Sequence, residues 1–308
     1  MTEPLQFAAD LPGQLLADES MAKHVSWRAG GPAKRAYVPN GLKDLADFLR
    51  ALPPGEPVCF VGLGSNLLVR DGGFDGSVVL MHDTQAHMSF EHGLVYAEAG
   101  AASPKLARFA ALQGYEGAEF LAGIPGTIGG ALAMNAGCYG SETWPCVARV
   151  QCIRRDGSVI ERLPADFDIG YRHVQLKTGG KLGEDEWFVG AYFRFSKGNS
   201  EQARARIKTL LDQRAASQPL NLPNAGSVFR NPPDDHAARL IEACGLKGYG
   251  IGGARISEKH ANFIVNPRGQ AKAADIEALI AHVRATVQER FGITLVTEVR
   301  IVGKELQA

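Results

Sequence analysis

Apolar and polar residues alternate along the first eighty positions with two different spacings, and each spacing predicts a different element. Residues 42–50 place apolar side chains three to four positions apart, as in an amphipathic helix, and the Pro-Pro-Gly sequence at 53–55 ends it. Residues 58–61 and 77–80 are short apolar runs on either side of a glycine turn, which is typical of buried strands. This part of the chain is therefore expected to alternate short strands with one helix.

The middle of the chain is richer in strand patterns. Residues 95–99 predict a strand, and Ser103 is expected to cap the helix that follows. The runs 147–154 and 159–163 flank an Arg-Asp-Gly-Ser turn, which predicts a β-hairpin, and 187–195 predicts another strand. The section is thus expected to consist mostly of strands and hairpins.

Helical spacing dominates the last third of the chain. Three helices are expected here, at 200–215, 234–244 and 272–291. The last two end at Gly245 and Gly292. Strand-like pieces are expected at 227–229 and 262–265, and regular alternation predicts a strand over 295–302. Because the strands cluster and hairpins are frequent, the pattern favours an α+β fold over a doubly wound one.

Charge and composition exclude two classes of partner. The 308 residues carry 33 Lys+Arg and 33 Asp+Glu, so there is no excess of cations to displace counterions from a nucleic acid. The longest uncharged run, 120–134, is interrupted by glycines and a proline and is shorter than the ~20 residues of a membrane span. Neither a nucleic acid nor a membrane is therefore expected as a partner.

Cysteine and histidine spacing gives no sign of a disulfide framework or a metal site. The five cysteines contain no Cys-x-x-Cys pair, which favours reduced thiols. His82, His87 and His92 lie five residues apart, a spacing that does not bring zinc ligands to one helix face. The first twenty residues lack the apolar segment of a secretory signal. We therefore expect a cytoplasmic protein, monomeric and without a metal.

Glycine is the unusual feature of the composition: 36 of 308 residues, about 12%, are glycine, against roughly 7% in typical proteins. In the first cluster, Gly62 and Gly64 stand in a pattern close to the dinucleotide fingerprint G-x-G-x-x-G. Leu67 replaces its third glycine and a strand is expected there instead of a helix, so a Rossmann site is disfavoured. A tight turn would explain the glycines alone, but Ser65 and Asn66 beside them favour a phosphate contact.

The second glycine cluster, residues 117–140, contains seven glycines and no charge after Glu119. It is too apolar for a flexible linker, which would carry Ser, Lys or Glu. Glycines among Ile, Leu and Met indicate close approach of the backbone to a large flat ligand, or to phosphates at a helix start. Tight packing of the chain against itself is the alternative.

Five motifs together resemble a known family. They are VGLGSNLLVRDGGFDG from residue 61, AGIPGTIGGALAMNAGCYG from 122, GYR at 170–172, NAGSVFRNP at 224–232 and TEVRIVG at 297–303. In this order they resemble the UDP-N-acetylenolpyruvoylglucosamine reductases, the flavoenzymes of bacterial peptidoglycan precursor synthesis. The resemblance extends over roughly residues 20–303 and implies reduction of UDP-N-acetylglucosamine enolpyruvate to UDP-N-acetylmuramate.

The resemblance implies a three-domain α+β flavoprotein. An FAD-binding unit of the vanillyl-alcohol-oxidase and p-cresol-methylhydroxylase type is expected over 1–84 and 85–198, with strand 293–303 returning to the second subdomain. Residues 199–292 are expected to form the substrate-binding domain. Residues 195–199 lead directly into the next helix. The chain therefore lacks the tyrosine-bearing loop that folds over the substrate in one class, and it resembles the family's shorter class.

The resemblance also implies two redox partners, FAD held without a covalent bond and NADPH as co-substrate. Both glycine clusters are expected to contact FAD through backbone amides, and an arginine is expected near the flavin pyrophosphate. The residues so assigned are Gly62, Leu63, Gly64, Ser65, Asn66, Leu67, Gly123, Ile124, Pro125, Gly126, Thr127, Ile128, Gly129, Asn135, Gly137 and Arg214.

The family's catalytic residues fall on Arg172, Ser227 and Glu298. A buried arginine has a fork that suits a carboxylate substrate, although a lone arginine is usually a surface residue. Ser227 is expected to deliver a proton, although from the sequence alone it could be a turn residue. Glu298 and Arg172 are expected to stabilise the enol-like species, although on an edge strand this carboxylate would simply be solvated.

Contacts to the rest of the substrate are expected from five residues: Tyr139, Arg230, Asn231, Lys259 and His260. Glu142 is a further candidate for the same pocket, and His260 could instead be a satisfied polar residue of a turn. Two other functions stay open at this point. One is an oxidase of alcohols or sugars that uses oxygen, for which Cys138 is the candidate covalent flavin attachment. The other is a non-catalytic flavin or nucleotide-sugar binding module.

Overall fold

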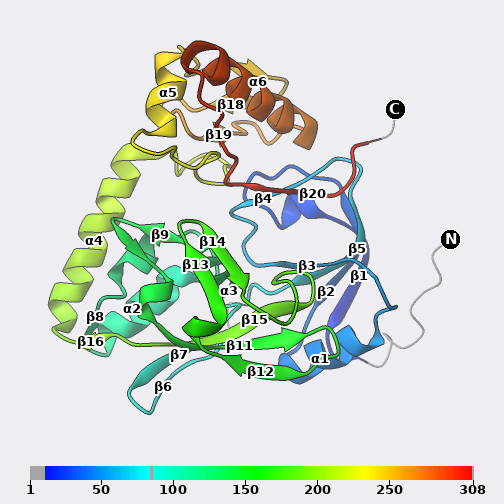
Figure 1. Cartoon of the computed structure of the whole chain (residues 1–308), viewed down its shortest axis with the longest axis vertical. Helices are drawn as coiled ribbons and strands as arrows, with labels where there is room; N and C mark the ends of the chain where they lie inside the picture. The colour runs from blue at the N-terminus through cyan, green and yellow to red at the C-terminus, as the bar shows by residue number, and fades with distance from the viewer. Residues whose placement is uncertain (1–10, 84–85, 307–308) are drawn as a thin grey trace. The chain divides into compact units, whose positions relative to one another are not determined.

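The computed structural model describes residues 11–83 and 86–306 (Figure 1). The fold divides into two compact units, each assembled from segments that lie far apart in the sequence. The first unit comprises the residues up to Ala17, 35–63 and 76–212, and the second comprises 18–34, 64–75 and 213–308. The chain passes from the first unit to the second within the first glycine cluster, between Leu63 and Gly64.

One sheet of the first unit packs against a single amphipathic helix. Its strands occur in the order β1 (Gln14–Ser20), β2 (Pro32–Val38), β5 (Phe74–Leu80) and β3 (Val58–Val61), and the helix is α1 (Leu42–Ala51). The apolar face of α1 is buried, and Phe48 stacks on Tyr37 with ring centroids 4.0 Å apart. Strands β3 and β5 run parallel, so this sheet is formed by a crossover instead of a simple hairpin.

A second, antiparallel sheet forms the larger core of the first unit. Its strand order is β12 (Val159–Arg162), β11 (Val147–Arg154), β15 (Glu186–Phe193), β7 (Leu94–Glu98) and β6 (Met88–Glu91). Every residue of β15 is buried, as expected of a central strand. The helices α2 (Ser103–Leu112) and α3 (Ile128–Ala133) contribute Leu106, Ala110 and Leu132 to the same core.

Shorter elements complete the first unit. The β13–β14 hairpin pairs Phe167–Gly170 with His173–Leu176, and α4 spans Ser200–Ser217, its last residues lying in the second unit. Two further pairs are β9 (Gly137–Cys138) with β10 (Ser141–Glu142), and β8 (Tyr115–Glu116) with β16 (Ser196–Lys197). Single 3-10 turns occur at η3 (Glu119–Gly123), η4 (Trp144–Cys146) and η5 (Pro164–Asp166).

The second unit is built around two helices and a small sheet. The helices are α5 (Ala237–Ala243) and α6 (Ala273–Phe291). The sheet consists of β17 (Gly250–Ile251), β18 (Ala254–Ile256) and β19 (Ile264–Val265). The unit also contains η2 (Met21–Lys23) and a parallel pair of strands, β4 (Leu67–Val69) and β20 (Arg300–Val302). Its core includes Trp27, whose indole N–H donates to the Ile264 carbonyl at 2.7 Å. Gly292 ends α6 in the left-handed region, as its position predicts.

The helices and the 147–163 hairpin are confirmed, but four local predictions are wrong. The piece predicted over 227–229 is not a strand in the described part of the chain, where Phe229 forms an isolated bridge. Ala102, not Ser103, occupies the N-cap of α2, and the buried Ser103 hydroxyl has no hydrogen-bond partner among the described residues. Of the strand predicted over 295–302, only Arg300–Val302 is regular. That strand pairs with Leu67–Val69 and therefore returns to the range 1–84, not to 85–198.

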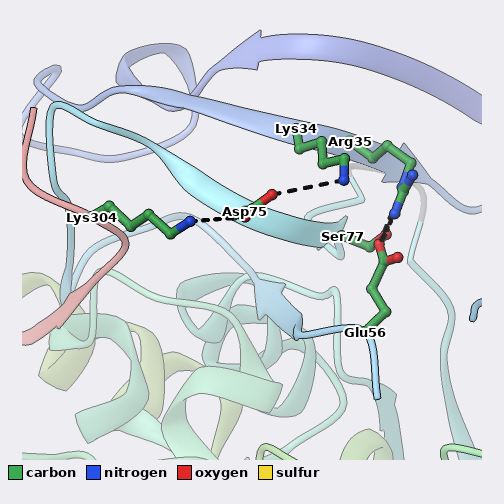
Figure 2. A network of polar contacts seen from close by, with 6 residues as sticks. All are labelled: Lys34, Arg35, Glu56, Asp75, Ser77 and Lys304. Atoms are coloured by element: carbon green, nitrogen blue, oxygen red, sulfur yellow. Dashed lines mark hydrogen bonds and ion pairs between the residues drawn. The ribbon is translucent and has the colours of Figure 1, made fainter. Parts of the chain in front are cut away.

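Two polar clusters lie along β2 and β5 (Figure 2). In the second unit, Asp75 lies between Lys34, at 3.7 Å, and Lys304, at 2.8 Å. In the first unit, the buried Glu56 carboxylate accepts hydrogen bonds from Arg35 Nε at 3.1 Å and from Ser77 Oγ at 2.6 Å. The Arg35–Glu56 pair is thus shielded from water, whereas the Asp75 pairs are exposed.

Candidate active site

A cavity of about 640 Å³ opens in the first unit beside the tip of the β13–β14 hairpin. Its walls combine the end of the second glycine cluster with that tip and with Glu142. The lining residues are Gly117, Phe120, Gly137, Cys138, Tyr139, Gly140, Ser141, Glu142, Pro145, Cys146, Tyr171 and Arg172. The structure therefore brings together in one cavity the predicted site residues Gly137, Tyr139 and Arg172 and the further candidate Glu142.

Arg172 is held at this cavity by backbone carbonyls. It lies in the two-residue turn of the hairpin with φ 54°, an unusual conformation for a residue with a side chain. Its Nη1 donates to the Asn135 carbonyl at 3.3 Å and its Nη2 to the Gly137 carbonyl at 3.2 Å. Two donors of the guanidinium are therefore oriented by backbone carbonyls of the second glycine cluster.

Asn135 has a second role that its motif did not predict. The residue is buried, and its Nδ2 donates to Glu142 Oε2 at 2.9 Å and to the Gly170 carbonyl at 3.1 Å. Its Oδ1 accepts the Trp144 N–H at 3.1 Å. The side chain of Asn135, a residue expected to contact FAD through its backbone, thus joins the glycine cluster to the hairpin that carries Arg172.

Two other residues of the second cluster use their amides within the protein. The Ile128 N–H donates to the Ala101 carbonyl at 2.8 Å, and the Gly129 N–H donates to the Ala99 carbonyl at 2.9 Å. Thr127 caps the short helix by accepting the Gly130 N–H. The N–H groups of Ile124 and Asn135 likewise donate to the Leu121 and Leu132 carbonyls, so the predicted contacts of these four backbone amides to FAD would compete with acceptors inside the protein.

Tight packing explains two of the predicted glycines. A Cβ on Gly123 would lie 2.5 Å from Tyr139 Cε2, and a Cβ on Gly62 would lie 2.3 Å from Thr127 Oγ1. Gly123 thus admits the Tyr139 ring, whose hydroxyl donates to the Leu210 carbonyl of α4 at 2.6 Å. Gly62 allows the first glycine cluster to lie against the second.

The turn that begins the second unit's part of the first cluster is open to an anion. Gly64 has φ 60°, and its carbonyl accepts the Ser26 N–H at 3.2 Å. Among residues 11–83 and 86–306, none accepts a hydrogen bond from the N–H groups of Gly64, Ser65 and Asn66. Successive unoccupied amides in such a turn form a concave site for phosphate oxygens. These residues therefore fit the pyrophosphate of FAD.

Ser227 and Glu298 lie on adjacent segments of the second unit. The Glu298 N–H donates to the Val228 carbonyl at 2.8 Å, and Phe229 forms a single antiparallel bridge with Thr297. Gly226, with φ 73°, turns the chain just before Ser227. Both side chains are half-buried. Glu298 is thus hydrogen-bonded through its backbone to Val228, the residue after Ser227, although Ser227 and Glu298 are 71 residues apart in the sequence.

The predicted substrate and pyrophosphate contacts of the second unit are mostly used within the fold. Asn231 Oδ1 accepts the Ala237 N–H at the start of α5, and Lys259 Nζ donates to the Ala215 carbonyl at 2.6 Å. Arg214 Nε donates to Gln218 Oε1 at 2.8 Å. Arg230 differs, because its buried Nε has no acceptor among the described residues. It is therefore the best placed of these four to bind an anion.

His260 lies half-buried in a turn. Burial lowers the pKa of its imidazole below the ordinary value. Its Nδ1 accepts the Asn262 N–H at 3.3 Å, and its ring meets Phe263 edge-on, with ring centroids 4.7 Å apart. With Nδ1 as an acceptor, a neutral imidazole carries its proton on Nε2.

No helix in residues 11–83 and 86–306 is long and apolar enough to cross a membrane. In the same ranges, no group of three or more His, Cys, Asp or Glu side chains could hold a metal ion.

Comparison with known families first defines the class of the protein. A family model described as "FAD binding domain" matches residues 33–162, which include the second glycine cluster and most of the first unit's two sheets. A second model, described as "UDP-N-acetylenolpyruvoylglucosamine reductase, C-terminal domain", matches residues 218–302, which include Ser227 and Glu298. The chain is therefore a flavoprotein with a separate C-terminal domain.

Relatives over the full length define the family. A protein of Thiobacillus denitrificans named UDP-N-acetylenolpyruvoylglucosamine reductase is 56% identical over 96% of this chain and 94% of its own. One of Legionella pneumophila with the same name is 52% identical over 94% and 93%. The crystal structure of UDP-N-acetylenolpyruvylglucosamine reductase from Thermus caldophilus is 30% identical, with a TM-score of 0.77 over 94% of this chain and 98% of that chain. The chain belongs to the UDP-N-acetylenolpyruvoylglucosamine reductase family.

These matches confirm the family, the α+β flavoprotein fold class and the assignment as an FAD-containing oxidoreductase. The three-domain division and the role of each site residue stay predictions.

Proposed function

We propose that this chain reduces UDP-N-acetylglucosamine enolpyruvate to UDP-N-acetylmuramate with electrons from NADPH, as a step in peptidoglycan precursor synthesis. Family membership over nearly the whole chain supports the reaction class. The observation that supports the proposal is the hydrogen bond from the Glu298 N–H to the Val228 carbonyl, because it joins the segment that carries this carboxyl to the segment that carries the Ser227 hydroxyl. An enol ether that gains a hydride at one carbon needs a proton donor at the other.

FAD is the group that these residues would hold. The amides of Gly64, Ser65 and Asn66 would bind its pyrophosphate. When bound, FAD transfers a hydride that originates from NADPH to the alkene carbon β to the substrate carboxylate. The other tasks, which are to orient the substrate, to stabilise the charge that develops and to supply a proton, belong to the side chains of this chain.

Arg172 and Glu298 would stabilise the substrate as it gains a hydride. Hydride addition at the β carbon leaves a pair of electrons on the α carbon, delocalised onto the carboxylate as an enolate. The guanidinium fork of Arg172 suits the two carboxylate oxygens, and Glu298 in its protonated form would donate to the same group. These preorganised donors lower the free energy of the transition state more than that of the bound substrate.

Ser227 would complete the reduction by protonating the α carbon. Its hydroxyl O–H bond breaks, the proton joins the α carbon, and the serine oxygen recovers a proton from water. Gly226 before it and the hydrogen-bonded segment after it constrain the backbone that carries the hydroxyl. The net change is one hydride from NADPH and one proton from solvent added across the carbon–carbon double bond.

Four further points are proposals of the same kind. Arg230 would bind an anionic part of the substrate, because its Nε has no acceptor in the described part of the chain. His260 would donate from Nε2. The protein would act as a monomer in the cytoplasm, and it would need neither a nucleic acid nor a membrane as partner, which its balanced charge supports.

The test follows NADPH oxidation by the purified, yellow protein with and without the enolpyruvyl substrate, under air and under argon. We expect oxidation to require the substrate and to proceed under argon with one NADPH consumed per substrate reduced. Substrate-independent turnover that requires oxygen would identify an oxidase. A colourless protein that takes up no FAD would contradict both enzymatic functions.

A further inference from the structure

We propose that Asn66 and Asn262 are positioning residues that together fix the relative placement of Ser227 and Glu298. The inference rests on the proposed function, and it assigns to Asn66 a role beyond the FAD contact expected from its motif. Asn66 bonds to the backbone of Glu298, and Asn262 bonds to the segment that follows Ser227. Both act on the backbone that carries them.

Asn262 holds the segment that follows Ser227 at three points. Its Oδ1 accepts the Phe229 N–H at 3.0 Å and its Nδ2 donates to the Phe229 carbonyl at 2.8 Å. Its backbone carbonyl accepts the Val228 N–H at 2.9 Å. The side chain is buried, so water cannot replace these bonds without opening the fold. The two residues after Ser227 therefore have a single backbone position.

Asn66 holds the segment of Glu298 from the other side. Its Nδ2 donates to the Glu298 carbonyl at 3.1 Å, and its own carbonyl accepts the Arg300 N–H at 3.0 Å. The Glu298 N–H in turn donates to Val228, which Asn262 fixes. Both peptide groups of Glu298 are thus tied, one to the Ser227 segment and one to the first glycine cluster.

This arrangement matters because proton delivery depends steeply on geometry. A displacement of about 1 Å at a reacting group can cost on the order of 10²-fold in rate. The Leu295–Val299 stretch is not a regular strand, so it lacks the full ladder of hydrogen bonds that would otherwise hold it. The two asparagine side chains supply the missing constraints. The Asn66 side chain is used in this way, whereas its backbone N–H stays open for an anion.

A buried asparagine can also serve the fold alone, and Asn266 is the matched control for Asn262. Asn266 is buried in the same unit, its Nδ2 donates to the Trp27 carbonyl at 2.9 Å, and its Oδ1 accepts the Ala271 N–H at 3.0 Å. It therefore makes two comparable bonds to backbone, but to segments that carry neither Ser227 nor Glu298.

The experiment measures both half-reactions of the FAD-loaded protein in a stopped-flow instrument under argon. Asn262→Ala, Asn266→Ala and Asn66→Ser are compared with wild type for flavin reduction by NADPH, for reoxidation by the enolpyruvyl substrate, and for the solvent deuterium isotope effect on reoxidation. Flavin content and melting temperature are recorded for each. We expect Asn262→Ala and Asn66→Ser to slow reoxidation by 10- to 100-fold with a raised isotope effect. We expect Asn262→Ala to leave flavin reduction within two- to three-fold of wild type.

Several outcomes would overturn the inference. Asn262→Ala and Asn266→Ala could show equal falls in melting temperature and in reoxidation rate relative to wild type, in which case Asn262 is structural only. Asn66→Ser could lose FAD while its residual holoprotein reoxidises normally, in which case Asn66 is a flavin contact only. If Asn262→Ala does not fold, Asn66→Ser still tests the same constraint. If wild type itself is not reoxidised by the substrate, the proposed function fails first.

Discussion

At the scale of single residues, proton delivery by Ser227 gives the sharpest prediction. Ser227→Ala removes the hydroxyl but none of the backbone bonds that fix Val228. We therefore expect reduction of the flavin by NADPH to stay near the wild-type rate, while reoxidation by the enolpyruvyl substrate falls by 10²- to 10⁴-fold, the usual contribution of a general acid. Stopped-flow absorbance of the flavin measures both steps. Equal losses in the two steps would contradict a role for Ser227 as proton donor.

Gly64 gives a second residue-scale prediction. Its φ of 60° and the position of a Cβ, 2.2 Å from the His24 carbonyl oxygen, both oppose a side chain. Gly64→Ala should destabilise the protein by about 2–5 kcal/mol, because left-handed strain and overpacking add. Gly140→Ala is the control, since Gly140 has φ 79° but open space around its Cβ. It should lose only about 1–2 kcal/mol. Similar melting temperatures for the two variants would refute the steric argument.

From the sequence, roles could be proposed for single residues, but the contacts of those residues could not be predicted. Ser227, Glu298 and Arg172 were recognisable because each stands inside a specific motif. The roles of Asn135 and Asn262 were not, because an asparagine has no distinctive pattern and its partners lie 7 to 35 residues away. The acceptors of the Ile128 and Gly129 amides were missed for a related reason. Nothing in a sequence shows that a carbonyl from another segment already accepts a hydrogen bond.

At the scale of elements, the buried ion pair between Arg35 of β2 and Glu56 gives a prediction about stability. Figure 2 shows the Glu56 carboxylate between Arg35 and Ser77, and the two charged side chains of this cluster are 8% and 12% exposed. Glu56→Gln keeps the volume but leaves the Arg35 charge without its counter-charge. We expect a loss of about 3–5 kcal/mol in the free energy of unfolding. Urea denaturation monitored by circular dichroism measures it.

Asp75→Asn is the matched control for this element, because Asp75 lies on β5 two residues before Ser77 and its side chain is 56% exposed. Lys304 and Lys34 hold the pKa of its carboxyl below the ordinary value. This pair is screened by water, so its removal should change the midpoint very little. An effect of Asp75→Asn as large as that of Glu56→Gln would show that burial does not decide the strength of these contacts.

Helices were predicted more accurately than strands, for a local reason. The signals for α1 and α6 are local: apolar residues recur with a 3.6-residue spacing, and a glycine directly follows α6. A strand needs a partner, and Leu295–Val299 has the alternation of a strand but finds only a single bridge, at Phe229. Ser103 failed as a cap because the helix begins at Ser103 itself, one residue earlier than its chemistry favours.

At the scale of the whole molecule, the order of segments was the least predictable feature. The sequence suggests consecutive domains, yet each compact unit gathers segments from distant parts of the chain. Strand β20 pairs with β4 although more than 230 residues separate them. Such pairings depend on which sheet edge is left open after the rest has folded, and no local pattern reports that. The family resemblance implied the right fold class because a family's motifs carry this long-range information indirectly.

The zero net charge of the whole chain leads to a prediction about ionic strength. The proposed substrate is strongly anionic, yet 33 Lys+Arg balance 33 Asp+Glu, so there is no long-range positive field to attract it. Attraction must come from local groups such as Arg172 and Arg230 and from backbone amides, within a few ångströms of the ligand. Raising the ionic strength from about 0.01 M to about 0.15 M shortens the Debye length from about 30 Å to about 8 Å, which still exceeds those distances.

We therefore expect kcat/KM for the enolpyruvyl substrate to fall by only a few-fold over that range of ionic strength. The measurement is the initial rate of NADPH oxidation in two different salts, which separates screening from ion binding. Arg230→Gln, in contrast, should raise KM at every ionic strength. A fall of a hundred-fold or more in wild type, shared by both salts, would mean that a clustered patch of charge steers the substrate and that the local contacts are not sufficient.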